Sequence, residues 1–135
     1  MSQFTLHPRL EAETCLISDL RLSQLRLQNQ KAVPWMILVP RRTETELYQL
    51  SKDDRALLMD EIAQVSEILK ELYMPHKINV ATLGNMVPQM HVHVVGRYKD
   101  DPAWPAPVWG RLDPAPYTLG AIKEIKEKWL GLMIK

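Results

Sequence analysis

The sequence predicts an α+β protein, with an antiparallel β-sheet of about five strands, one long helix packed on it and a second helix near the C-terminal end. Two observations support this fold class. Short segments in which apolar residues alternate, as in half-buried strands, occur both before and after the middle of the chain. Between them, apolar residues recur every three or four positions over residues 52–73, which is the spacing of an amphipathic helix.

Strands are expected on the N-terminal side of that helix. Residues 4–13 indicate a short helical or irregular lead-in, and alternating apolar residues then predict strands over residues 14–19 and 20–28. The segment 29–34 has the composition of a turn, and the apolar run 35–39 that follows is bounded by prolines. This run is expected to be a central strand.

The long helix has a clear start. Ser51 precedes two aspartates in the first turn, as at a capped helix N-terminus. Its apolar stripe consists of Leu58, Ile62, Val65, Leu69 and Leu72. Residues 77–83 then alternate weakly and connect through a tight loop to residues 89–96, so these two segments are expected to be adjacent antiparallel strands. A proline- and tryptophan-rich segment follows, and apolar spacing predicts a last helix over residues 118–131.

Length and composition limit the function classes. The 135 residues are expected to form one domain, 1–135, with a core over about 14–97 and a tail over 98–135. Seventeen basic and sixteen acidic residues give a net charge of +1, which argues against binding to nucleic acid backbones. No stretch resembles a secretion signal or a membrane span, and the single Cys15 suits a reducing compartment. A cytoplasmic protein without a membrane partner is expected.

The segment Gln89 to Gly96 is the strongest candidate for chemistry. On a strand, successive side chains point to opposite faces, so Gln89, His91 and His93 would share one face. The other face would carry Met90, Val92 and Val94. Residues two apart lie roughly 6.5 Å apart along a strand, close enough for two imidazoles to act on one phosphate-sized group.

Two other interpretations of the histidines remain open. A His-x-His pair on a half-exposed strand is often purely structural. It can also bind Zn²⁺, but that requires a third and usually a fourth ligand. The available side chains are not at a recognisable ligand spacing; they are His7, His76, Cys15, Asp100 and Asp101.

A longer pattern favours the functional interpretation. The run Gly84-Asn85-x-Val87-x-Gln89-x-His91-x-His93-Val94-Val95 resembles the signature of the histidine triad (HIT) family of nucleotidyl hydrolases and transferases. The resemblance continues through Asn29, residues 34–40 and the helix 52–73, and the later run 101–110 looks like the tail of a bacterial branch of the family. There are two departures: Gln89 stands at the first triad position, and Trp35 stands where many members have a further histidine.

The resemblance implies a mechanism. His91 would be the nucleophile that is transiently nucleotidylated, and its other ring nitrogen would be held by the backbone carbonyl of residue 89. The Gln89 side chain therefore need not prevent catalysis, although it cannot relay protons near neutral pH. His93 would donate to a phosphate oxygen or to the leaving group.

The resemblance also implies binding residues and partners. Asn29 corresponds to the polar residue that holds the ribose hydroxyls, and Gly84 and Asn85 would contact phosphate, although an ordinary turn explains these two as well. No metal or other cofactor is expected, and many members of the family are homodimers that share a continuous sheet. Arg97 is a weaker candidate for phosphate contact. Packing explains Trp104 and Trp109 better than ligand contact.

These features together predict a hydrolase or nucleotidyltransferase that acts at the α-phosphate of a nucleoside phosphate derivative. Dinucleoside polyphosphates, such as diadenosine polyphosphates, and nucleoside phosphoramidates are the candidate substrates. Gln89 and Trp35 motivate an alternative, a purine-nucleotide-binding protein with little or no turnover. A metal-binding His-x-His protein is the third candidate.

Overall fold

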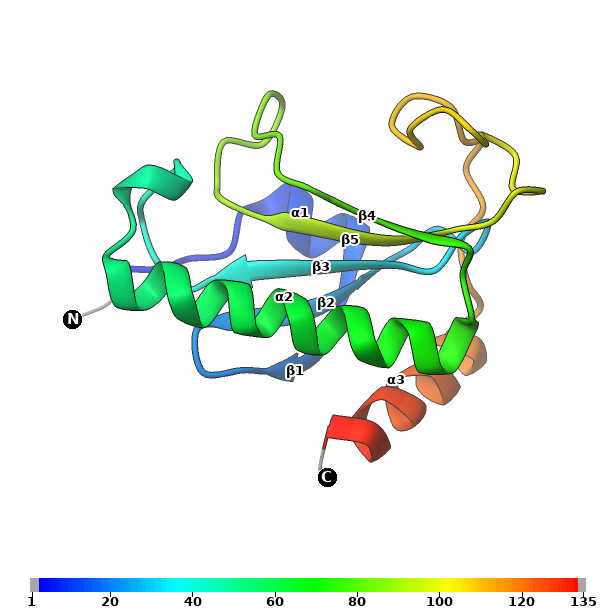
Figure 1. Ribbon diagram of the computed structural model, residues 1–135, viewed down its shortest axis with the longest axis horizontal. Coiled ribbons are helices and arrows are strands. Elements are labelled where there is room, and N and C mark those ends of the chain that lie inside the picture. Colours follow the sequence, from blue (N-terminus) through cyan, green and yellow to red (C-terminus); the bar gives the residue numbers. More distant parts are fainter. Residues whose placement is uncertain (1–2, 134–135) are drawn as a thin grey trace.

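The computed structural model describes residues 3–133, so the four terminal residues of the expected domain lie outside the described part. The predicted α+β fold is confirmed: five strands form one antiparallel sheet in the order β1-β2-β3-β5-β4 (Figure 1). In chain order the elements are α1 (Pro8–Glu13), β1 (Thr14–Asp19), β2 (Ser23–Gln28), β3 (Trp35–Pro40), a 3₁₀ turn (Leu47–Gln49), α2 (Lys52–Tyr73), β4 (Lys77–Ala81), β5 (Val92–Arg97) and α3 (Leu119–Met133).

The sheet is covered differently on its two faces. In Figure 1, α2 and α3 lie in front of the sheet and α1 lies behind it. The larger apolar core lies beneath α2 and α3 and includes Leu25, Met36, Leu69, Val94 and Trp129. A smaller core on the opposite face includes Leu10, Trp35, Ile37, Val95 and Val108. The alternation of side chains along β3 and β5 therefore divides each strand between two cores.

Helix α2 begins and ends as the sequence predicts. The Ser51 hydroxyl accepts a hydrogen bond from the Asp54 amide at 3.1 Å, which satisfies one N–H of the first turn. The helix ends at Tyr73 and is capped by Met74, whose left-handed backbone (φ 49°, ψ 47°) is followed by Pro75. The predicted apolar stripe faces the sheet, because Leu58, Val65 and Leu69 are all buried.

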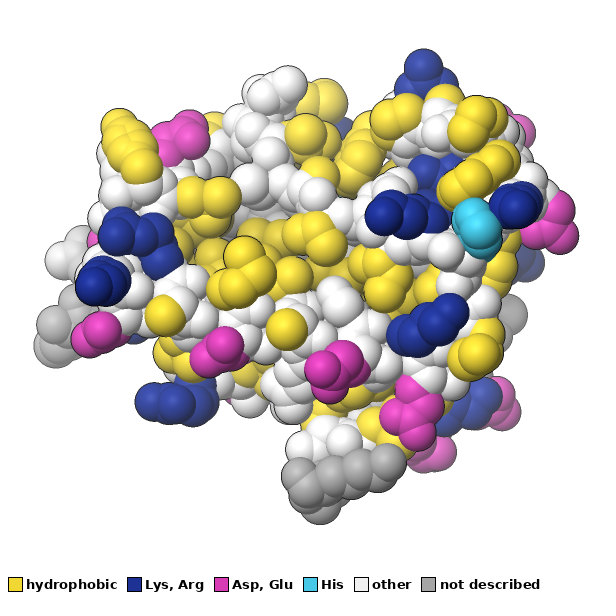
Figure 2. All heavy atoms as spheres, viewed as in Figure 1, with side chains coloured by type: hydrophobic (Ala, Val, Ile, Leu, Met, Phe, Trp, Pro, Cys, Tyr) yellow, Lys and Arg dark blue, Asp and Glu magenta, His cyan; other side chains and the backbone are white. Residues whose placement is uncertain are grey.

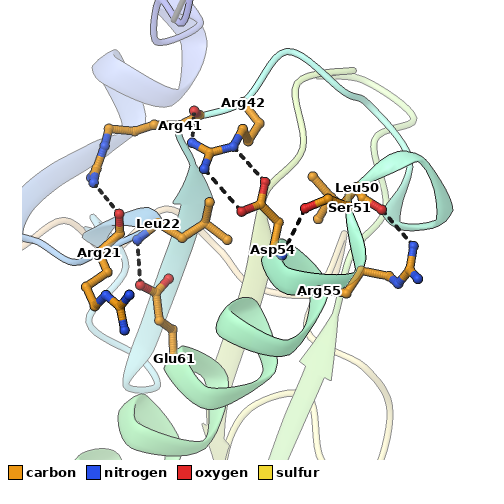
Figure 3. Close-up of polar contacts among 9 residues, drawn as sticks. All are labelled: Arg21, Leu22, Arg41, Arg42, Leu50, Ser51, Asp54, Arg55 and Glu61. Carbon is orange, nitrogen blue, oxygen red and sulfur yellow. Dashed lines mark hydrogen bonds and ion pairs between the residues drawn. The ribbon is translucent and has the colours of Figure 1, made fainter.

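The N-terminal half of α2 is attached to the β1–β2 turn and to the end of β3 (Figure 3). Arg42 donates to the two carboxylate oxygens of Asp54 at 2.7 and 3.1 Å. About two turns further along the helix, the buried Glu61 accepts a hydrogen bond from the Leu22 amide at 2.8 Å. These bonds fix the helix relative to the sheet whose other face carries the histidines.

The predicted strand ends are wrong at three places. The strand expected over residues 20–28 begins at Ser23, because Leu20 and Ser23 close a turn with a 2.8 Å backbone bond. The strand expected over 77–83 ends at Ala81. The strand expected over 89–96 begins only at Val92, where it pairs with Leu38; continuing that register would bring Met90 opposite Pro40, which has no N–H to extend the ladder.

The remaining predictions of local structure agree with the observed elements. The lead-in contains the short helix α1, with Pro8 in its first turn, and the last helix runs two residues beyond the end predicted for it. Among residues 3–133, none of the helices combines the length and the apolar character that crossing a membrane requires.

Candidate functional site

His91 and His93 lie together on the face opposite α2, although β5 begins only after His91. Their ring centroids are 4.9 Å apart at an angle of 74°, and each residue is 7% exposed. Met90, Val92 and Val94 point the other way and belong to the core beneath α2. The alternation expected from the sequence therefore holds, even though the first part of this segment is not in the hydrogen-bonded ladder.

The backbone of residue 89 orients the His91 ring. Nδ1 of His91 lies 2.7 Å from the carbonyl oxygen of Gln89. A carbonyl can only accept, so the proton of the neutral imidazole resides on Nδ1 and the lone pair on Nε2. Within residues 3–133 this Nε2 has no hydrogen-bond partner. The ring is thus arranged as a nucleophile whose reacting nitrogen is open.

The second imidazole has an unusual partner. The indole Nε1 of Trp35 donates to Nδ1 of His93 at 3.0 Å. Trp109 lies edge-on against the same imidazole, with 5.2 Å between ring centroids. Burial and, to a smaller degree, the neighbouring His91 lower the pKa of His93 to about 3. His93 is therefore neutral at any pH near physiological.

The two tryptophans of the tail have different positions. Trp109, for which the sequence favoured packing, lies against His93 as well as against Trp35. Trp104 packs away from the site, beside His76 and over the guanidinium of Arg97. The sequence did not distinguish them, because both lie between prolines in irregular chain.

A cavity of about 300 Å³ opens beside the histidines. The loop before β5 forms part of its wall, including Gly84 and Asn85. Gly84 has φ +74°, a backbone conformation that favours glycine. The rest of the lining is Arg9, Leu10, Glu13, Gln28, Trp35, Ile37, Leu83, Met86, Val87 and Trp109, together with the two histidines. The cavity thus combines two imidazoles, an amide-bearing loop and an aromatic wall.

Asn29 does not line that cavity. It lies in an adjoining hollow of about 660 Å³, and its side-chain oxygen accepts the Tyr117 amide at 2.8 Å. The two hollows share Arg9, Glu13, Gln28, Trp35 and Trp109. The structure therefore places four of the six predicted site residues in one cavity and joins Gln89 to it through the carbonyl bonded to His91. The sixth, Asn29, lies in the adjoining hollow, and its acceptor oxygen is bonded to the tail.

Sequence reasoning missed the contribution of α1. Arg9 and Glu13 line both hollows and form an ion pair at 3.2 Å, with their side chains about half exposed. The only signal in the sequence is their opposite charge at a spacing of four in a short helix. This pair supplies charged side chains beside the histidines.

The side chains of Gln89 and Arg97 make hydrogen bonds that hold the fold together rather than contacts with the cavity. The Gln89 amide accepts the His7 amide N–H and donates to the Thr5 carbonyl, both at 2.8 Å. Arg97 is 1% exposed and donates to Asp101 at 2.9 and 3.0 Å, so the suggestion that it contacts phosphate is wrong. Despite burial, the bonds from Arg97 and nearby backbone amides lower the pKa of Asp101 to about 2.

The side chains considered as metal ligands are dispersed. His7 caps α1 by accepting the Arg9 amide, His76 packs on Trp104 and Asp101 pairs with Arg97. In the part of the chain that the structure describes, no group of three or more His, Cys, Asp or Glu residues is placed to hold a metal ion.

Comparison with known proteins adds independent evidence. A family model described as the HIT domain matches residues 9–100. The chain is similar to the crystal structure of a histidine triad protein from Marinobacter aquaeolei VT8, with 45% identity, a TM-score of 0.92 and coverage of 96% of this chain and 95% of that one. No curated protein sequence matches the chain significantly.

Two further solved structures resemble it to a similar degree. A histidine triad (HIT) protein from Sinorhizobium meliloti 1021 has 39% identity and a TM-score of 0.93, over 97% of this chain and 98% of that one. A histidine triad protein from Bradyrhizobium japonicum has 40% identity and a TM-score of 0.89, over 93% and 94%. In each case the similarity covers more than nine-tenths of both chains.

Proposed function

This chain belongs to the histidine triad (HIT) family of nucleotide-binding hydrolases and transferases, and we propose that it cleaves nucleoside phosphate derivatives at the α-phosphorus through a covalent intermediate on His91. The main support is the 2.7 Å contact between His91 Nδ1 and the Gln89 carbonyl, because it leaves Nε2 with a lone pair beside the cavity.

The reaction proceeds in two displacements. Nε2 of His91 attacks the α-phosphorus, the bond from phosphorus to the leaving group breaks, and the leaving group takes the electron pair of that bond and a proton from water. Water then attacks the same phosphorus, the P–N bond breaks and the nucleoside monophosphate departs. The second displacement returns a proton to water, so the two steps balance. His93 donates to a phosphate oxygen or to the leaving group, and the loop at Gly84 and Asn85 binds phosphate. The nucleoside extends into the hollow beside Asn29.

The leaving group is a nucleotide polyphosphate or an amine, so dinucleoside polyphosphates, including diadenosine polyphosphates, and nucleoside phosphoramidates are the substrates to test. We propose that no metal or other cofactor takes part, so a chelator leaves activity unchanged. We further place this activity in the cytoplasm, because the lone Cys15 thiol suits a reducing compartment.

The decisive measurement is the intact mass of the protein after a brief, cold incubation with an adenylate phosphoramidate. We expect a mass increase of one AMP on the wild type and none on His91→Ala or His91→Gly. His76→Ala is the matched control, since His76 lies outside the cavity, and it should form the adduct.

The same samples test the alternative of a binding protein without turnover. Gln89 favours that alternative, because its side chain is bound to the N-terminal segment and cannot relay a proton. Thermal stabilisation by AMP without adduct or product formation would support the binding protein and contradict the enzyme.

We also propose a homodimer formed through the edge strand β4. Its outer edge carries no sheet neighbour among the described residues, and an apolar hollow of about 320 Å³ lies between it and α2. Figure 2 shows hydrophobic side chains gathered over this region, and Met59 (62% exposed) and Val80 (48% exposed) contribute to it. A second copy would extend the sheet and cover this surface.

A further inference from the structure

Trp35 contributes a hydrogen bond whose direction is unambiguous. It stands at the start of β3, is 7% exposed, and its Nε1 lies 3.0 Å from Nδ1 of His93. An indole nitrogen can only donate, so Nδ1 of His93 must offer a lone pair. A neutral imidazole has one N–H, which here must be at Nε2.

The two imidazoles of the site are therefore opposite tautomers. A carbonyl at Nδ1 of His91 leaves a lone pair on its Nε2, whereas an indole N–H at Nδ1 of His93 leaves a hydrogen on its Nε2. Neither Nε2 bonds to any residue between 3 and 133. One imidazole is arranged to attack and the other to donate.

The surroundings also oppose a charge on His93. A proton on Nδ1 of His93 would point at the indole N–H of Trp35 inside a buried contact. The indole N–H would lose its acceptor and the new N–H would have none. The titratable residues that line the cavity with it are His91, Arg9 and Glu13, and the last two pair with each other. Burial and His91 act in the same direction and lower the pKa of His93.

We propose that Trp35 is a positioning residue that fixes His93 as its Nε2–H tautomer, so that His93 remains a neutral hydrogen-bond donor across the working pH range. That this N–H serves a substrate phosphate rests on the function proposed above. The replacement of a histidine by Trp35, which the sequence presents as a departure from the family pattern, then has a chemical role.

Nitrogen NMR tests the tautomer directly, without substrate. In histidine-labelled protein, two-bond ¹H–¹⁵N spectra show which ring nitrogen of each of the four histidines lacks a hydrogen. His93, assigned by its absence in His93→Gln, should have a bare Nδ1 and should not titrate between pH 5 and 8. In Trp35→Phe we expect a mixture of the two neutral tautomers, because the donor that holds Nδ1 as an acceptor is gone. Burial and the neighbouring His91 still lower the pKa of His93 in this variant, so its ring should stay neutral between pH 5 and 8.

Trp109→Phe is the matched control. Trp109 also packs against His93, but its indole N–H has no hydrogen-bond partner in the described part of the chain, so this variant reduces aromatic packing without removing a bond. His93 should keep its tautomer in Trp109→Phe. If both variants change the His93 spectrum alike, or if wild-type Nδ1 is protonated, the proposal is overturned.

Kinetics on a nucleoside phosphoramidate then test the use of the N–H. Trp35→Phe should lower kcat/KM by about threefold to tenfold at neutral pH, since part of the population presents a lone pair to the phosphate. The deficit should be similar from pH 5 to 8, because burial and His91 keep the His93 ring neutral in the variant as well. If the NMR spectra show the expected tautomer but neither the wild type nor any variant turns over the substrate, the proposed function is refuted. The role of Trp35 in fixing the tautomer would then still stand.

Discussion

At the scale of the residue, Gln89 has two tasks, one for its backbone and one for its side chain. Its carbonyl oxygen orients His91, and its side chain joins the N-terminal segment at His7 and Thr5 to the site. Only the first task belongs to the proposed chemistry, and it depends on the backbone rather than on the side chain. The replacement of a triad histidine by glutamine is therefore compatible with a correctly oriented nucleophile.

This separation predicts the behaviour of Gln89→Ala. The variant keeps the carbonyl and should still form the adduct on His91, but it loses two hydrogen bonds and should lower the free energy of unfolding by about 1–2 kcal/mol in urea titrations. Gln64→Ala, at an exposed site on α2, should change stability by less than about 0.5 kcal/mol. A folded Gln89→Ala that cannot form the adduct would show that the side chain takes part in the reaction.

At the scale of the element, α2 and β5 differ in how well the nearby sequence predicts where they begin and end. The cap at Ser51, the apolar stripe and the break before Pro75 are all within or beside α2, so both of its ends were predicted correctly. The start of β5 depends on Pro40, some fifty residues earlier in the chain. A strand ends where its partner can no longer bond, which its own sequence does not indicate.

Side chains of α2 and of the turn before β3 pack directly against the backbone of β5 at Gly96. A Cβ atom there would lie 2.7 Å from Pro34 Cγ and 2.8 Å from Leu69 Cδ2, closer than atoms can pack. We expect Gly96→Ala to lower the free energy of unfolding by about 1–3 kcal/mol, measured by urea denaturation, because α2 and the turn before β3 must shift.

Gly131→Ala is the control for this substitution. Gly131 lies inside α3, and a Cβ there would meet no atom within 4 Å. Alanine should stabilise this helix by up to about 1 kcal/mol. If the two alanine variants were equally stable, close packing at Gly96 would be refuted.

At the scale of the whole molecule, the uncovered edge at β4 predicts the assembly state. Light scattering at micromolar concentration should give twice the mass of one chain for the wild type. Val80→Lys places a charge on the proposed interface and should give a monomer, because the lysine would be buried unpaired.

Leu119→Lys should remain a dimer, because Leu119 is 86% exposed at the start of α3, away from the hollow between α2 and β4. A monomeric wild type, or equal effects of the two lysines, would contradict an interface at β4. The proposed tautomer of His93 is tested independently of this result, since the bond from Trp35 lies within one chain.

The sequence by itself determined the α+β class, the bounds of α2, and the alternation that places His91 and His93 on one face. These features follow from periodicity and capping, which act between residues a few positions apart. Only the tertiary structure decided that Trp35 donates to His93, that the Gln89 amide binds the N-terminal segment and that Arg97 is buried with Asn79 and Asp101. Most of these partners are 18 to 82 positions apart, and Asp101, only four residues from Arg97, lies in irregular chain. Local preferences do not specify such contacts, because they form only when packing of the sheet brings the side chains together.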